Sequence, residues 1–133
     1  MARGPKKVLV VEDNSDWRLL LSIVIERAGY DVISATTGRD GVALALSKQP
    51  DLIFMDLGLP ELSGDEATAQ IKANEGTKHI PVVIQTAFGA GPIAQRAIDA
   101  GAAEILHKPI AISAIQATVK KYLSANLKAA TLG

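Results

Sequence analysis

The chain has 133 residues, 48% of them apolar, and its 14 basic and 14 acidic residues balance. This size and composition suit one globular domain with its own core and exclude an intrinsically disordered chain. The balanced charge creates no overall attraction to nucleic acid or anionic lipid, and the absence of cysteine excludes disulfides, thiolate metal sites and cysteine nucleophiles.

Five short runs of β-branched or aliphatic residues are typical of strands. In chain order they lie at Val8–Val11, Val32–Ile33, Leu52–Met55, Val82–Ile84 and Ile105–Leu106. The first, third and fourth runs show no polar alternation, which is expected of central strands that are covered on both faces. The second and fifth runs are shorter and more mixed, so we expect them at the edges of the sheet.

Segments with the apolar spacing of helices alternate with these strands. They are expected at Ser15–Ala28, Gly38–Lys48, Ser63–Asn74, Pro92–Ala100 and from Ala111 to about Leu127. Ser63 and Glu66 have the spacing of a capping box, and Gly29 and Gly101 stand where C-terminal caps are expected. Five β-α units with short links and right-handed crossovers predict an α/β fold, a doubly wound five-stranded parallel sheet with five helices on its two faces.

No segment of the sequence predicts membrane insertion or export. The densest apolar stretch, Leu19 to Ile25, is much shorter than the ~20 residues that a spanning helix needs. The basic start of the chain is followed by too short an apolar run for a signal peptide. We predict a cytoplasmic protein with a flexible leader at residues 1–5, one domain at 6–124 and a helix end and tail at 125–133.

Polar residues follow four of the predicted strands, at the sheet edge where doubly wound folds place their ligand sites. Glu12 and Asp13 follow the first strand, Asp56 the third, Thr86 the fourth and Lys108 the fifth. Three carboxylates at one edge repel one another unless a cation is present. Mg²⁺ uses such oxygen ligands and keeps several waters, so we predict Mg²⁺ held by Asp13, Asp56 and Glu12, the last directly or through water.

A carboxylate nucleophile, a divalent metal and fixed donors are the components of phosphoryl transfer. Lys108 would add a second positive charge for the phosphoryl group, and Thr86 would add a donor. Each residue alone also has an ordinary explanation, since Asp13 or Asn14 can cap a helix and a lysine before proline is common on surfaces. The joint placement at matching strand ends favours the phosphoryl-transfer site.

With these residues the sequence resembles the receiver domain of two-component response regulators, over roughly Lys6 to Leu123. The segments that carry the resemblance are Val10–Asn14, Asp51–Pro60, Ser63-Gly64, Pro81–Val83, Thr86-Ala87, Gly101-Ala102 and Lys108-Pro109. The resemblance implies the flavodoxin-like strand order 2-1-3-4-5 that is known from a chemotaxis regulator. It also implies a cis peptide bond between Lys108 and Pro109.

The resemblance assigns the acceptor and the metal ligands. Asp56 would be the phosphoacceptor, served by a phosphohistidine on a sensor histidine kinase or a histidine phosphotransfer protein. Glu12, Asp13 and Asp56 would bind Mg²⁺ together with the backbone carbonyl of Gly58.

The resemblance also implies a switch. Lys108, Thr86 and the backbone of Ala87 would contact the phosphoryl group, and Thr86 would move toward it. Receiver domains usually carry Tyr or Phe three residues before the lysine, but Ile105 stands here. Since an aliphatic side chain has no polar tip, we expect the loop with Phe88 to carry the rearrangement. Unchanged partner affinity of a phosphorylated Phe88→Ala variant would contradict this expectation.

Trp17 lies one turn into the first predicted helix, close to Asp13. We expect its ring to pack in the core and its emission to report Mg²⁺ binding.

Three functions are compatible with these residues. The first is a phosphorylatable switch that promotes its own phosphorylation and slow dephosphorylation without being a turnover enzyme. The second is a small Mg²⁺-dependent hydrolase or phosphotransferase, which the short links disfavour because they leave no substrate loop. The third is a scaffold that binds partners without phosphate, which Ile105 favours and the complete acidic site disfavours.

The expected output of the switch is binding of another protein. We expect the downstream partner at the face made by the fourth helix, fifth strand and fifth helix. DNA binding would need a module that this sequence lacks.

Overall fold

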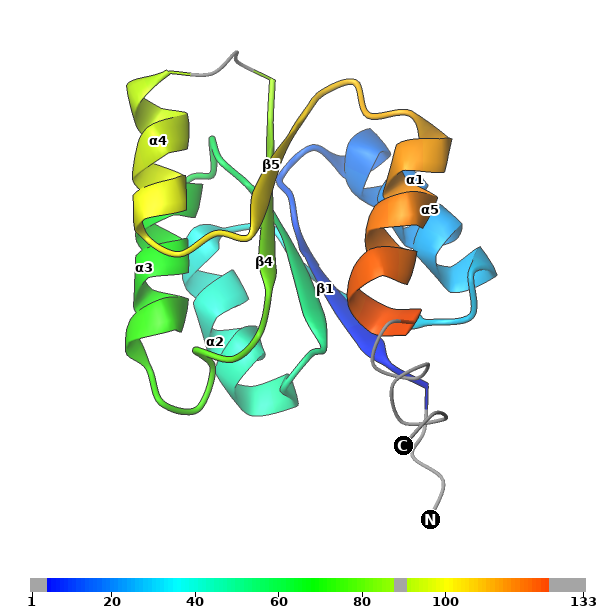
Figure 1. Ribbon diagram of the computed structural model, residues 1–133, viewed down its shortest axis with the longest axis horizontal. Coiled ribbons are helices and arrows are strands. Elements are labelled where there is room, and N and C mark those ends of the chain that lie inside the picture. Colours follow the sequence, from blue (N-terminus) through cyan, green and yellow to red (C-terminus); the bar gives the residue numbers. More distant parts are fainter. Residues whose placement is uncertain (1–4, 88–90, 125–133) are drawn as a thin grey trace.

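The computed structural model describes residues 5–87 and 91–124. The strands are β1 (Lys7–Val11), β2 (Asp31–Ala35), β3 (Leu52–Asp56), β4 (Val82–Thr86) and β5 (Glu104–His107). The helices are α1 (Ser15–Arg27), α2 (Gly38–Lys48), α3 (Gly64–Ala73), α4 (Pro92–Asp99) and α5 (Ile112–Val119), which continues into a π-helical turn, η1 (Lys120–Ser124). The predicted alternation of strands and helices is confirmed (Figure 1).

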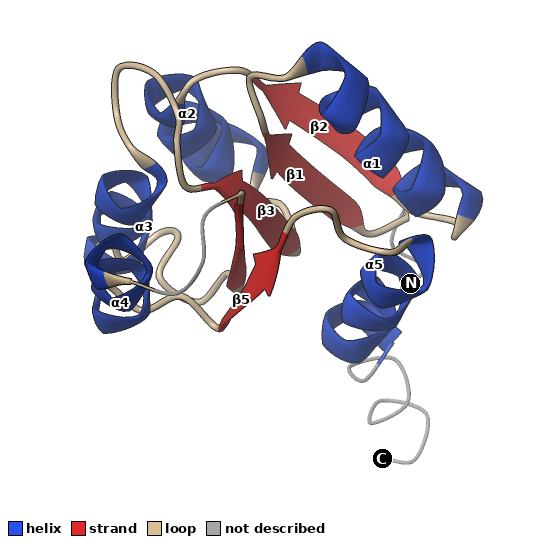
Figure 2. Ribbon diagram, turned by 90° about the horizontal axis from the view of Figure 1, so that it is seen from above, coloured by secondary structure: helices blue, strands red, loops and turns tan. Residues whose placement is uncertain are grey.

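The sheet has the order β2-β1-β3-β4-β5, and every neighbouring pair is parallel. The predicted order 2-1-3-4-5 is therefore confirmed, with the two short mixed runs at the edges. Helices α1 and α5 cover one face of the sheet, and α2, α3 and α4 cover the other (Figure 2). This is the flavodoxin-like, doubly wound α/β arrangement.

Two apolar cores lie on the two faces of the sheet. The core under α1 and α5 includes Val8, Val10, Leu52, Phe54 and Val83. The core under the other three helices includes Leu9, Val11, Ile53, Met55 and Ile84. Successive side chains of a strand point to opposite faces, so a strand buried on both faces needs apolar residues at every position. This explains the uninterrupted apolar runs of the three central strands.

The starts of the helices follow the local signals in the sequence. Asn14 caps α1, and its side-chain oxygen accepts the backbone N–H of Trp17 at 2.8 Å. Ser63 precedes α3, and its backbone N–H donates to the Glu66 carboxylate at 3.3 Å, as the predicted capping box requires. Pro92 occupies the first turn of α4, where its missing N–H removes no helical hydrogen bond.

The C-terminal helix differs from the prediction. An α-helix to about Leu127 was expected, but α-helical geometry ends at Val119 and the π-helical turn follows. In this turn the Tyr122 hydroxyl and the Lys121 ammonium both bind the Glu104 carboxylate on β5. Burial and the bond to Glu104 raise the pKa of Tyr122 to about 12. The wider turn accommodates these contacts with β5, which apolar periodicity does not reveal.

Some predictions lie outside the described residues. Residues 1–4 and 125–133 belong to the predicted leader and tail, and Phe88 to the predicted switch loop. The domain bounds and the role of Phe88 therefore stay predictions. In the described part of the chain, no helix is long and apolar enough to cross a membrane.

Gly64 explains one of the matching sequence segments in physical terms. A Cβ atom at this position would lie 2.2 Å from the backbone oxygen of Asp56 and 2.8 Å from the Cα of Leu57. Only glycine lets the start of α3 pack this closely against the end of β3. We expect Gly64→Ala to lower the free energy of unfolding by about 1–3 kcal/mol, because backbone has to move. Equilibrium urea unfolding measures this loss.

Gly58 provides the matched control, because it lies in the same loop and a Cβ there would meet no atom within 4 Å. We expect Gly58→Ala to keep or slightly raise the stability, since alanine reduces the freedom of the unfolded chain. Equal losses in the two variants would contradict the packing argument for Gly64.

Candidate functional site

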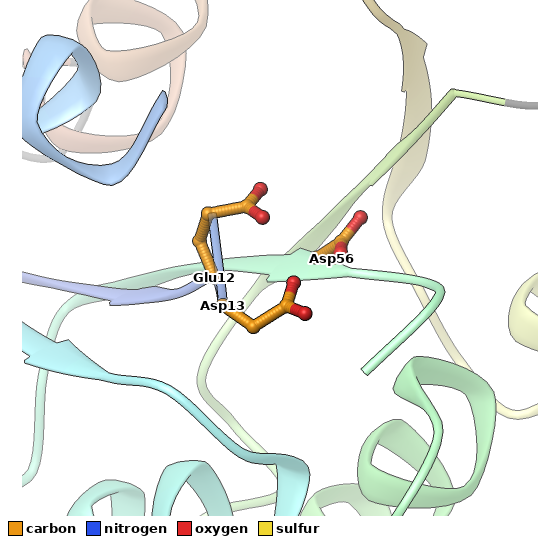
Figure 3. A group of neighbouring side chains, drawn as sticks. All are labelled: Glu12, Asp13 and Asp56. Carbon is orange, nitrogen blue, oxygen red and sulfur yellow. The ribbon is translucent and has the colours of Figure 1, made fainter. Parts of the chain in front are cut away.

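Three carboxylates meet beyond the carboxyl ends of β1 and β3. Val11 and Met55 are paired in the parallel ladder, so the residues that follow them also lie side by side. Glu12, Asp13 and Asp56 each offer an oxygen that lies within 4.8 Å of the others (Figure 3). The predicted convergence of these acids is therefore present in the structure.

Two of the three carboxylates are buried. Glu12 is 1% exposed and Asp56 is 7% exposed, whereas Asp13 faces solvent. Burial, together with the charge of Asp56, raises the pKa of Glu12 above its ordinary value. Burial and the charge of Asp13 raise the pKa of Asp56, although Lys108 opposes the change. The site therefore holds negative charge that a bound cation would stabilise.

Lys108 lies against this cluster, as predicted. Its ammonium is 2.7 Å from Glu12 Oε1 and 3.3 Å from Asp56 Oδ1. Burial alone would lower the pKa of Lys108, but the hydrogen bond to Glu12 and the two negative charges raise it. The peptide bond between Lys108 and Pro109 is cis, as the resemblance implied. The shorter contact joins Lys108 to Glu12, which the sequence did not indicate.

Glu12 is held on both carboxylate oxygens. Oε1 accepts from Lys108, and Oε2 accepts the backbone N–H of Asn14 at 3.1 Å. The Arg18 guanidinium donates to the backbone carbonyl of Glu12 at 2.9 Å. These contacts orient the turn from β1 into α1 and leave Asp13 as the exposed carboxylate of the cluster.

The other predicted residues lie on β4 and β5 or in the loops that follow β3 and β4. Thr86 ends β4, is 1% exposed, and its backbone carbonyl accepts the Lys108 N–H at 2.8 Å. Ala87 and Gly58 follow β4 and β3 and are exposed at the same edge of the sheet. Ile105 is half-buried on β5 and lines a hollow against α4. Their roles in phosphoryl contact, metal binding and switching stay predictions.

Gln85 is a residue of this region that the sequence analysis missed. It is fully buried on β4, opposite Asp56 in the ladder, and its Oε1 accepts the Trp17 indole N–H at 2.7 Å. The Trp17 ring also lies 5.9 Å from the Lys108 ammonium. The available signal was a glutamine directly after the apolar run Val82–Ile84, because a buried amide needs a partner.

The donor set of the cluster fits Mg²⁺. Three carboxylates without nitrogen or sulfur ligands suit a hard divalent cation, and the raised pKa values of Glu12 and Asp56 reflect charge that lacks full compensation. Lys108 supplies one positive charge against three carboxylates. Among the described residues, this cluster is the one group that could hold a metal ion.

We expect Mg²⁺ to raise the thermal unfolding midpoint of the metal-free protein. A ligand at 100 times its Kd adds about 2.7 kcal/mol to the free energy of unfolding. The single tryptophan, Trp17, lies beside the cluster, so its emission should follow the same titration. Asp13→Asn should weaken both responses, while Asp16→Asn should keep them because Asp16 is exposed and outside the cluster. Equal responses in the two variants would contradict the assignment of the cluster.

Comparisons with known proteins agree on one family. Residues 8–120 match the response regulator receiver domain. The chain is 39% identical over 119 residues to the polar-differentiation response regulator DivK of Brucella anthropi, covering 90% of this chain and 97% of the relative.

Solved structures give the same result. The receiver domain of the sensor histidine kinase PA1611 from Pseudomonas aeruginosa, solved with magnesium in its active-site cleft, is 28% identical. It has a TM-score of 0.83 over 92% of this chain and 99% of its own. The chemotaxis response regulator CheY4 of Vibrio cholerae is 28% identical, with a TM-score of 0.83 over 90% of this chain and 99% of its own.

Proposed function

This chain belongs to the receiver domains of two-component response regulators, and we propose that it takes a phosphoryl group onto Asp56 and signals by changing its protein-binding surface. Its family consists of phosphorylation-dependent switches in signal transduction. The observation that carries the proposal is the position of the Asp56 carboxylate, 3.3 Å from the Lys108 ammonium and beside Glu12 and Asp13.

The proposed reaction is a direct transfer from a phosphohistidine. An oxygen of the Asp56 carboxylate forms a bond to phosphorus while the phosphorus–nitrogen bond of the donor breaks. The electron pair of the broken bond stays on the imidazole, which leaves, and an acyl phosphate remains on Asp56. Bound Mg²⁺ supplies positive charge that offsets the charge of the phosphoryl oxygens.

The chain's own residues bind and orient the transferred group. Lys108 already faces Asp56 and would donate to a phosphoryl oxygen, so its ammonium needs little movement. Thr86 and the backbone N–H of Ala87 would donate to the other oxygens from the end of β4. Asp13, Asp56 and the Gly58 carbonyl would ligate Mg²⁺, and Glu12 would add its charge directly or through water.

We propose the face of α4, β5 and α5 as the output surface. Ile98 on α4 is exposed and lines the same hollow as Ile105 and His107 of β5, which suits a protein partner. Movement of Thr86 toward the phosphoryl group would reach this face through Ile105, which lines the hollow against α4. The upstream partner would be a sensor histidine kinase or a histidine phosphotransfer protein, and we place the reaction in the cytoplasm.

Incubation with acetyl phosphate tests the proposal. Wild-type protein with Mg²⁺ should gain the mass of one phosphoryl group in intact mass spectrometry, and addition of a chelator should prevent the gain. A protein that binds Mg²⁺ but gains no mass would contradict the phosphoacceptor function.

One observation favours a second candidate, a scaffold that binds its partner without phosphate. Ile105 stands where the family usually has an aromatic switch residue, so the coupling to the output face differs from the usual one. The scaffold function predicts that partner affinity is the same before and after phosphorylation. The switch function predicts a change.

A further inference from the structure

The Trp17 ring is fixed between α1 and β4. The backbone N–H of Trp17 donates to the side chain of the cap residue Asn14, and the indole N–H donates to Gln85 Oε1 at 2.7 Å. The ring packs against the core under α1 and α5. The backbone of Trp17 is therefore held at the start of α1, and its ring is held by a buried strand.

The hydrogen bond with Trp17 fixes the orientation of the Gln85 side chain. Its side chain is fully buried, and an indole N–H can only donate, so the amide oxygen must face the ring. Among the described residues, the Gln85 amide nitrogen is the buried side-chain atom without a hydrogen-bond partner. An apolar residue would avoid this unpaired donor, as at Val82, Val83 and Ile84 of the same strand. The hydrogen bond to Trp17 therefore explains why a glutamine occupies this buried position.

The ring reaches the phosphoacceptor through Lys108. The Lys108 ammonium lies 5.9 Å from the ring centroid, within the range of a cation–π interaction, and contacts Glu12 and Asp56 with its hydrogen bonds. A lysine side chain has several rotatable bonds and can otherwise turn toward solvent. The ring borders the ammonium in the rotamer that faces Asp56.

We propose that Trp17, anchored by Gln85, is a positioning residue that keeps the Lys108 ammonium beside Asp56 and so speeds phosphoryl uptake. The inference rests on the proposed function of Asp56. A charge that is already in place stabilises the phosphoryl oxygens without reorganisation during transfer. Trp17 acts through Lys108 and does not itself touch the phosphoryl group.

The test measures the rate of phosphorylation by acetyl phosphate at saturating Mg²⁺. Trp17→Leu should slow the rate about two- to fivefold, the size expected for loss of a cation–π contact. Trp17→Phe should retain most of the rate because it keeps a ring. Gln85→Leu should slow the rate no more than Trp17→Phe does, because it keeps the whole indole and loses only the anchor, whereas phenylalanine also lacks the N–H that binds Gln85. Leu20→Ala, on the same helix and core, is the matched control and should lower stability without slowing the rate.

A double-mutant cycle separates positioning from packing. In a Lys108→Ala background, Trp17→Leu should have no further effect on the rate, because the residue it acts through is gone. A second measurement does not depend on the phosphorylation rate. Lys108→Met as a single substitution should shift the emission of Trp17 in the folded protein.

Three outcomes would overturn the inference. Trp17→Leu leaves the phosphorylation rate unchanged, or it slows the rate equally in the Lys108→Ala background, or Lys108→Met leaves the Trp17 emission unchanged. If wild-type protein gains no phosphoryl group, the proposed function fails instead.

Discussion

Asp56→Asn should abolish the gain of a phosphoryl group from acetyl phosphate and Mg²⁺. The amide has no anionic oxygen to attack phosphorus, and no other carboxylate of the site has the same position. Glu12 has both oxygens engaged by Lys108 and Asn14, and Asp13 lies on the solvent side. Intact mass spectrometry of both proteins after the same incubation measures the loss, which should be complete within detection.

Asp51→Asn is the matched control for this experiment. Asp51 immediately precedes β3, at the opposite edge of the sheet, and its carboxylate accepts the Lys7 backbone N–H at 2.9 Å. This variant should gain the phosphoryl group as wild type does. Because the Asp56 carboxylate is buried with a raised pKa, Asp56→Asn should also fold at least as stably as wild type without Mg²⁺. Full phosphorylation of Asp56→Asn would place the acceptor elsewhere.

The sequence predicted the convergence of the site because the backbone topology determines it. In a parallel sheet the residues after each strand meet at one edge, so Glu12, Asp13, Asp56 and Lys108 could be placed together without any coordinates. Recognising the strands required only apolar runs and short links. The same argument identified the two edge strands, since their runs are shorter and more mixed than those of the central strands.

Which side chains of the site contact one another depends on their geometry in the fold. The neighbouring residues in the sequence do not reveal these contacts. Lys108 was expected to face the phosphoacceptor, but its shortest contact is to Glu12, 96 residues away in the chain. Trp17 was expected to pack in the core close to Asp13, but its hydrogen-bond partner Gln85, 68 residues further on, was not predicted. Such long-range pairs follow from strand order and rotamers together.

The end of α5 shows a different limit of the sequence analysis. The apolar stripe continues past Val119 with nearly helical spacing, and Leu123 is indeed buried. Periodicity records which residues face the core, but it does not distinguish an α-helical turn from the wider π-helical turn. The contacts of Tyr122 and Lys121 with Glu104 on β5 accompany the π-helical turn, and they exist only in the folded structure.

Lys108→Met should lower the free energy of unfolding of the metal-free protein by about 3 kcal/mol at neutral pH. Removing one partner of a buried ion pair leaves the other charge uncompensated, at a cost of about 3–5 kcal/mol. We expect the lower end because the Lys108 side chain is 19% exposed. Urea unfolding measures the loss. Lys121→Met is the control: its ammonium also binds a carboxylate, but it is 64% exposed, so the loss should stay below about 1 kcal/mol.

The loss in Lys108→Met should depend on pH in a defined direction. The folded protein raises the pKa of Glu12 and Asp56 above 4.5 and 3.8, and without Lys108 both values should rise further. A carboxyl group with a raised folded pKa contributes stability below its unfolded pKa and loses it as the pH rises through the folded value. The difference between variant and wild type should therefore be small below about pH 4 and reach its plateau above the raised pKa values.

Mg²⁺ should reduce the same difference at neutral pH, because a divalent cation between the carboxylates replaces part of the charge that Lys108 supplied. Comparing the stability loss with and without Mg²⁺ tests whether Lys108 and the metal have the same electrostatic role, which is to supply positive charge to the three carboxylates. Unfolding curves of both proteins with Mg²⁺ and with chelator measure the change. A loss that is independent of pH and of Mg²⁺ would mean that Lys108 stabilises the fold by packing, without compensating Glu12 and Asp56.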